Sequence, residues 1–141
     1  MRNWKVAVVI VVLALLAGLY PYNTTVVPAW KLRIVDEKGK PYANMPATQA
    51  WKDYSLEIEP GQNLDIRPTN PDGYVEFPKR EIRANVLKRI FLMCLSAVMS
   101  LAHGSVGVKA YIHASGPHGY SEVSYEHGKP VPTQLVLPSD N

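Results

Sequence analysis

The sequence predicts an all-β fold: an antiparallel sandwich of about seven short strands, with one helical insertion and an apolar N-terminal helix. Three observations lead to this fold class. Several short segments alternate apolar and polar side chains with the period of two that half-buried strands show. Turn sequences separate these segments, and the 141 residues include 12 prolines and 9 glycines. One long stretch changes to helical spacing, and an unbroken apolar run lies near the start of the chain.

Length and charge limit the classes of function. A chain of 141 residues allows about one domain. The net charge is +3, but Arg2 and Lys5 precede residue 30 in a region without acidic residues, and the remainder has 13 basic and 12 acidic residues. We therefore expect no nucleic-acid binding, since that function needs a clearly basic surface. The one cysteine, Cys94, excludes an intrachain disulfide and a cysteine-rich zinc site.

Residues 1–22 have the pattern of a signal anchor or a signal peptide. Arg2 and Lys5 precede an apolar run of 14 residues at positions 6–19, shorter than the roughly 20 residues of an ideal membrane-spanning helix. Leucine occupies position −3 of both candidate cleavage sites, where signal peptidase needs a small residue. We expect an uncleaved transmembrane anchor that contacts the membrane through residues 6–20, with a cytoplasmic N-terminus and an extracytoplasmic domain. The alternative is a cleaved signal, which would make the domain a secreted protein.

The exported part begins with a linker at residues 23–29 and continues as one domain over residues 30–138. Four segments before residue 80 have the strand pattern: residues 30–35, 46–51, 54–58 and 74–77. A proline-rich loop is expected at residues 59–72. Three more strands are expected near the end of the chain: residues 108–114, 120–125 and 134–137.

A helix is expected over about residues 82–103, because the spacing of apolar residues there is i, i+3, i+4, i+7. These residues are Val86, Leu87, Ile90, Phe91, Cys94, Leu95, Val98, Met99 and Ala102. From residue 90 onward the helix is apolar nearly all round, and we expect it to pack on the sandwich. The alternative is a position in the membrane interface. A basic cluster near its start would suit anionic lipid: Lys79, Arg80, Arg83, Lys88 and Arg89.

Two segments carry a family resemblance. Residues 30–41 read Trp-Lys-Leu-Arg-Ile-Val-Asp-Glu-Lys-Gly-Lys-Pro, and residues 69–77 read Thr-Asn-Pro-Asp-Gly-Tyr-Val-Glu-Phe. The first resembles the opening strand and Val-Asp-x-x-Gly-x-Pro turn of the carboxypeptidase regulatory-like domains, and the second resembles their central turn and strand. With the last strands, the resemblance covers residues 29–138. It implies a transthyretin-like (prealbumin-like), seven-stranded sandwich without catalysis of its own, which stabilises or adheres to other proteins.

An enzyme of the same fold is an alternative, since the hydroxyisourate hydrolases are also transthyretin-like. Those enzymes use histidine and arginine residues together with a C-terminal Tyr-Arg-Gly-Ser, whereas this chain ends Leu-Pro-Ser-Asp-Asn. We therefore expect no enzymatic activity, no catalytic residue and no cofactor. The four histidines lack the spacing of a metal site, so no metal is expected either. Cys94 has no acid or base near it in the sequence, and we expect it to be a buried small apolar residue.

Aromatic and histidine side chains near the last strands are the candidates for binding. They are Tyr111, His113, His118, Tyr120 and Tyr125. Surfaces of this kind suit a peptide or a glycan, although core or cross-strand tyrosine pairs would explain the same residues. The expected function is therefore a non-enzymatic, membrane-anchored, exported module that binds an envelope protein or glycan or has a structural role. The main alternative is a membrane-interface protein whose helix at 82–103 binds lipid or a membrane partner.

Overall fold

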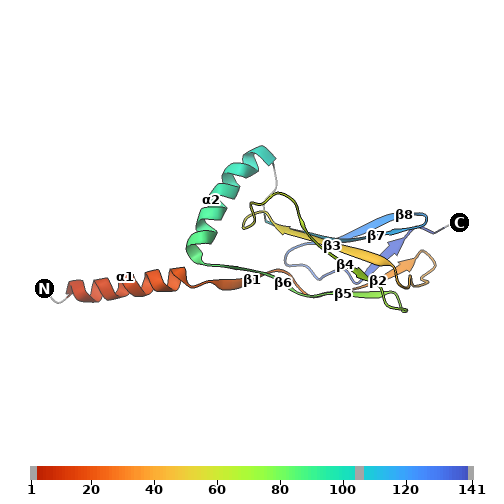
Figure 1. The fold of residues 1–141 in the computed structure, drawn as a ribbon, viewed down its shortest axis with the longest axis horizontal. Helices are drawn as coiled ribbons and strands as arrows, with labels where there is room; N and C mark the ends of the chain where they lie inside the picture. The colour runs from red at the N-terminus through yellow and green to blue at the C-terminus, as the bar shows by residue number, and fades with distance from the viewer. Residues whose placement is uncertain (1–2, 104–106, 140–141) are drawn as a thin grey trace.

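The computed structural model describes residues 3–103 and 107–139. Helix α1 (Asn3–Leu19) projects from one end of the molecule, and a second helix, α2 (Val86–His103), interrupts the series of strands (Figure 1). The strands are β1 (Tyr22–Val27), β2 (Trp30–Asp36), β3 (Pro46–Asp53), β4 (Asn63–Pro68), β5 (Tyr74–Phe77), β6 (Arg80–Ala84), β7 (Val108–Gly116), β8 (Gly119–Tyr125) and β9 (Gln134–Leu137). A mostly β fold with two helices is confirmed, but the described residues form nine strands where seven were expected.

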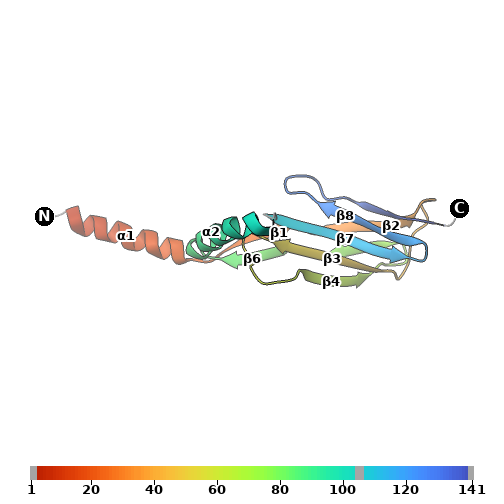
Figure 2. The same ribbon diagram turned by 90° about the horizontal axis from the view of Figure 1, so that it is seen from above.

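The strands form three sheets. A three-stranded sheet has the order β5-β2-β9, and a four-stranded sheet has the order β4-β3-β7-β8. These two sheets lie one over the other as the layers of the domain (Figure 2). Strands β1 and β6 form a separate two-stranded ribbon that leads from α1 to the layers. All the strand pairs are antiparallel except β2 and β9, which run parallel.

The core lies between the two layers and follows the alternation of the strands. Trp30, Leu32 and Ile34 of β2 are fully buried, and Ile112 of β7 faces them from the other sheet. The indole Nε1 of Trp30 donates a hydrogen bond to the carbonyl of Pro132 at 2.6 Å, which satisfies its one polar atom inside the core.

The two turns that carry the family resemblance pack against each other. In the first, the carboxylate of Asp36 accepts hydrogen bonds from the backbone N–H groups of Lys38 and Lys40 at 2.9 and 2.7 Å. In the second, Gly73 has φ +80°, and a Cβ built there would lie 2.7 Å from the carbonyl oxygen of Ile34 and 2.8 Å from Cβ of Pro41. Only glycine fits at that position, so the second turn can lie directly on β2 and the first turn.

The sequence prediction was wrong about two segments after β3. Residues 54–58 form a turn and coil instead of a strand, because the side chain of Asp53 accepts a hydrogen bond from Ser55 N at 2.9 Å and turns the chain. Within the expected loop at 59–72, residues 63–68 pair with β3 as β4, from Trp51 opposite Asn63 to Pro46 opposite Pro68.

Two further boundaries differ around the ribbon. The expected linker at 23–29 contains most of β1, because the β-branched run Thr24 to Val27 pairs with β6. The expected helix at 82–103 starts only at Val86, because residues 82–84 belong to β6 and the side chain of Asn85 caps the helix by accepting a hydrogen bond from Lys88 N at 2.8 Å.

A transmembrane helix was also expected at the N-terminus. Within residues 3–103 and 107–139, no helix combines the length and the apolar character needed to cross a membrane.

Candidate functional site

The end of the molecule that carries both helices has the most exposed apolar surface. We call α1, the β1–β6 ribbon and α2 the helical end (Figure 1). Helix α1 has 17 residues and none of them is buried. Its large apolar side chains, from Val6 to Leu19, are about half exposed or more, so no other part of the described chain covers them. Soluble domains rarely leave an apolar surface of this extent uncovered, and such surfaces mark contacts with a membrane or a partner.

The ribbon fixes the start of α2 next to the end of α1. Tyr22, three residues after the last residue of α1, pairs with Ala84, the last residue of β6. The guanidinium of Arg89 donates hydrogen bonds to the carbonyls of Tyr22 at 2.9 Å and Ala84 at 3.2 Å, and lies 4.0 Å from the centre of the Tyr22 ring. Arg89 is buried, so its charge is held by carbonyl dipoles and an aromatic ring. This cluster ties the first turns of α2 to the ribbon.

Helix α2 has one buried face and one exposed apolar face. Arg89, Leu92 and Ser96 are buried on the side of the sandwich. Six large apolar residues of the helix are exposed: Leu87, Ile90, Phe91, Met93, Val98 and Met99. Cys94 is also exposed, so the prediction of a buried cysteine was wrong. The packing of this helix on the domain is limited to one face, and the residues near Leu92 on that side include the turn after β3 and the following loop.

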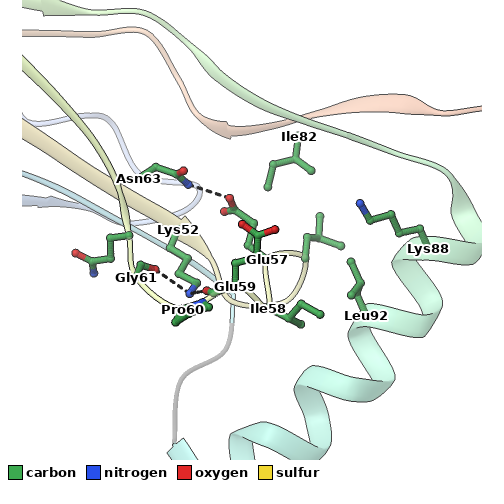
Figure 3. A pocket seen from close by; sticks show the side chains of 12 residues that line it. Lys52, Glu57, Ile58, Glu59, Pro60, Gly61, Asn63, Ile82, Lys88 and Leu92 are labelled. Carbon is green, nitrogen blue, oxygen red and sulfur yellow. Dashed lines mark hydrogen bonds between the residues drawn. The ribbon is translucent and has the colours of Figure 1, made fainter.

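Two cavities lie between α2 and the sandwich. The first, of about 400 Å³, is bounded by the loop before β4 and by Lys88 and Leu92 of α2 (Figure 3). The buried Lys52 donates hydrogen bonds to the carbonyls of Glu59 and Gly61 and so holds this loop in place. Backbone oxygens satisfy the ammonium group of Lys52. A structural role is therefore sufficient to explain why this lysine is buried.

The second cavity, of about 560 Å³, has a mostly apolar wall that includes Ile90 and Met93 of α2. Asp53, Arg89 and His127 also line it. Burial raises the pKa of Asp53, and hydrogen bonds from the backbone of the following turn and the charge of Arg89 offset only part of this effect. Asp53 and Arg89 already have hydrogen-bond partners within the turn and the ribbon.

The basic residues predicted near the start of the helix do not form one patch. Arg80 points into the domain, donates to the side chain of Gln49 at 2.9 Å, pairs with Asp65 and lies 4.1 Å from the Trp51 ring centre. Arg89 is buried as described. Of the other three, Lys79 forms an ion pair with Glu81 at 2.5 Å, whereas Arg83 and Lys88 are exposed at the helical end.

Three of the five predicted binding residues meet on the outer face of the four-stranded sheet. The ring of His113 lies 5.9 Å from that of Tyr111 and 5.7 Å from that of Tyr120. The hydroxyl of Tyr111 donates to the side chain of Gln62 at 2.8 Å. The hydroxyl of Tyr120 donates to the carboxylate of Glu122, and this hydrogen bond raises the pKa of Tyr120 to about 12.

The other two candidates lie elsewhere. Tyr125 faces the core side, with its ring 6.4 Å from that of Trp30 in an edge-to-face arrangement. His118 lies in the exposed turn between β7 and β8. Two apolar residues that the sequence analysis did not single out belong to the outer face: Leu64 and Ile66 of β4 are 62% and 64% exposed. Their Leu-Asp-Ile-Arg alternation was the available signal, hidden by the prolines on either side.

A metal site would need several ligating side chains close together in the described part of the chain. Within it, no three histidine, cysteine, aspartate or glutamate side chains gather as metal ligands. Of the four histidines, His103 belongs to the last turn of α2, and its side chain lies outside the described part of the chain. Comparisons with protein-family models, with curated proteins and with solved structures found no match.

Proposed function

We propose that this protein is a non-enzymatic β-sandwich module that its N-terminal helix holds at a membrane. The observation that carries the proposal is α1, whose apolar side chains are exposed along its whole length. Moving a large apolar side chain out of water contributes about 1.5–3 kcal/mol. Because α1 carries many such side chains, its transfer from water into lipid is strongly favourable in free energy.

Helix α1 is short for a membrane-spanning helix, and the proposal requires the bilayer to adapt to it. Seventeen residues give a helix of about 26 Å, compared with a hydrocarbon thickness of about 30 Å. Trp4 and Tyr20 flank the apolar run, where aromatic residues favour the two interfaces. A small local thinning of the bilayer would accommodate the difference. Because Lys5 precedes the apolar run, we place the N-terminus on the cytoplasmic side and the sandwich on the other.

The proposed role of the sandwich is that of a transthyretin-like adhesive or structural domain in the cell envelope. The packing of the Asp36 turn against Gly73 supports this, because both turns belong to the segments that resemble the carboxypeptidase regulatory-like domains. The outer face with Tyr111, His113 and Tyr120 is the proposed contact for an envelope protein or glycan. The aromatic rings of this face provide apolar contact area for such a partner, and the tyrosine hydroxyl groups can form hydrogen bonds with it.

The test is membrane fractionation of cells that express the full chain with a C-terminal tag. We expect the protein in the membrane pellet after alkaline extraction, at full mass, with the tag open to protease from outside. A variant with Val9→Arg and Leu13→Arg should move to the soluble fraction, whereas the matched Val9→Leu and Leu13→Val variant should stay in the pellet. Recovery of the unaltered chain in the soluble fraction, with or without cleavage, would contradict the anchor.

A further inference from the structure

We infer that α2 docks on the surface of the bilayer through an exposed apolar stripe, so that the membrane holds the sandwich at two points. The stripe consists of Leu87, Phe91, Cys94 and Val98. The inference rests on the proposed insertion of α1 and extends it, because it assigns a second membrane contact and a fixed orientation of the domain.

The stripe is continuous and lies opposite the buried face of the helix. Residues spaced i, i+4, i+7 and i+11 fall on one side of an α-helix. Leu87, Phe91 and Val98 are 53%, 65% and 65% exposed. At 100° per residue, the centre of this stripe is about half a turn from the centre of Arg89, Leu92 and Ser96, the buried residues. Figure 3 shows Lys88 and Leu92 toward the loop, so the stripe is directed away from the sandwich.

The ribbon holds the stripe near the place where α1 would leave the membrane. Tyr22 follows the last helical residue, Leu19, by three residues, which span at most about 10 Å when extended. The Tyr22–Ala84 pair and the hydrogen bonds of Arg89 then join the start of α2 to this point. The headgroup region extends about 5–7 Å beyond the hydrocarbon core. The first turns of α2 therefore lie within reach of the lipid surface.

The charges at the helical end favour a bilayer with anionic lipids as the surface on which the stripe docks. No acidic residue occurs in positions 1–35 or in positions 82–121, which contain α1, β1 and α2. Arg83, in β6, and Lys88, in the first turn of α2, are exposed at the helical end. An amphipathic helix with basic residues next to an apolar face is typical of helices that lie in the membrane interface. Where the leaflet that faces α2 contains anionic lipids, each basic residue near its surface adds about 1 kcal/mol to binding.

The direction of α2 also fits a helix that lies on a surface. Figure 1 shows α2 running across the direction of α1 and not continuing it. If α1 enters the bilayer with the tilt that is common for such helices, α2 lies along the surface and its stripe faces the lipid. The buried face of α2 then supports the sandwich above it.

Cys94 provides the test, because it is the one cysteine of the chain and lies in the stripe. The full chain is reconstituted in vesicles of phosphatidylcholine and phosphatidylglycerol, with an environment-sensitive fluorophore on Cys94. The matched control carries Cys94→Ser and Ser124→Cys, which places the label on the exposed face of β8. We expect blue-shifted emission from Cys94, strong quenching by nitroxide lipids and several-fold less quenching by aqueous iodide than at position 124.

The outcomes separate this inference from the proposed function. If the chain does not float with the vesicles, α1 is not an anchor and both fail. If it floats but iodide quenches the two labels equally, the anchor stands and the docking of α2 is overturned. Protection of Cys94 from both iodide and nitroxide lipid would show a protein partner or a second copy on the stripe, which also overturns it.

A second variant checks the role of the stripe without a change in the buried face. Phe91→Ser together with Val98→Ser should raise iodide quenching at Cys94 several-fold, while the thermal unfolding midpoint stays unchanged. Unchanged quenching in this folded variant would overturn the inference.

Discussion

Gly73 shows how one residue without a side chain joins two turns of the domain. Its φ of +80° is the same as that of Gly39, but only at Gly73 would a Cβ collide with neighbouring atoms, the carbonyl oxygen of Ile34 and Cβ of Pro41. The two glycines therefore separate the effect of backbone strain from the effect of crowding.

We expect Gly73→Ala to lower the free energy of unfolding by more than about 2 kcal/mol, because strain and a backbone collision add together. The collision would also disturb the hydrogen bond from Ile34 N to the carbonyl of Gly73, which is 2.8 Å long. Gly39→Ala should cost only about 1 kcal/mol, the strain alone. Urea unfolding in detergent, followed by tryptophan fluorescence, measures both values. Equal losses would contradict the crowding at Gly73.

Asp65 gives the stability a dependence on pH. Partial burial works to raise its pKa, but the hydrogen bonds and charges of Arg80 and Arg67 prevail and hold the pKa below its ordinary value. A carboxyl group with a lowered pKa in the folded state contributes stability above its unfolded pKa and loses it as the pH falls through the folded pKa.

Asp65→Asn should therefore lower the unfolding midpoint at pH 7 and have a shrinking effect as the pH falls below about 3.9. Thermal unfolding over a series of pH values measures the difference between the variant and the unaltered chain. Asp72→Asn is the matched control, since Asp72 is exposed in the second turn. A constant difference at all pH values would show that the charge of Asp65 is not the cause.

At the scale of elements, two neighbouring residues on α2 belong to different faces of the helix, one packed against the domain and one exposed. Leu92 is 5% exposed and Phe91 is 65% exposed. We expect Leu92→Asp to destabilise the domain by about 3 kcal/mol or more, because it buries an unpaired charge and removes apolar contact. Phe91→Asp should leave the thermal midpoint of the detergent-solubilised chain within a few degrees. Equal destabilisation by the two variants would show that α2 covers the core on both faces.

Most elements could be predicted from the sequence because their side-chain pattern reflects their burial. β2 alternates apolar and basic residues, and its Leu32 and Ile34 are in the core as the pattern indicates. β4 was missed because its short alternation, Leu64 to Arg67, lies between Pro60 and Pro68 in a segment that has the composition of a loop. β1 and β6 were missed because each forms a strand only by pairing with the other. Their hydrogen-bonded residues Asn23 and Glu81 are 58 positions apart in the sequence.

The candidate site was predictable only in part. The cross-strand meeting of Tyr111, His113 and Tyr120 follows from the alternation of β7 and β8, which the sequence contains. The two faces of α2 were not predictable, because a helix that is apolar nearly all round gives no sign of which side is covered. The inward direction of Arg80 was equally hidden, since its partners Gln49 and Asp65 come from other strands.

At the scale of the whole molecule, β1 belongs to the domain although it directly follows α1. Val26 and Val27 are fully buried in the core, and β1 pairs with β6 along its length. Removal of residues 1–20 should therefore leave the unfolding midpoint of the domain unchanged, while removal of residues 1–28 should lower it by many degrees or prevent folding. Circular dichroism during heating compares the two truncated chains. Similar midpoints would show that the β1–β6 ribbon contributes little to the fold.

The parallel pairing of β2 and β9 has a mechanical consequence. A pull on α1 enters the domain through β1 and, once β1 has yielded, loads β2 at Trp30, whereas a pull from beyond β9 loads that strand at Leu137. Because the two strands are parallel neighbours, paired from Arg33 with Gln134 to Asp36 with Leu137, these forces shear their ladder in opposite directions. The hydrogen bonds then share the tension instead of opening one at a time. A domain tethered in this way resists stretching most strongly along the line that joins its two ends.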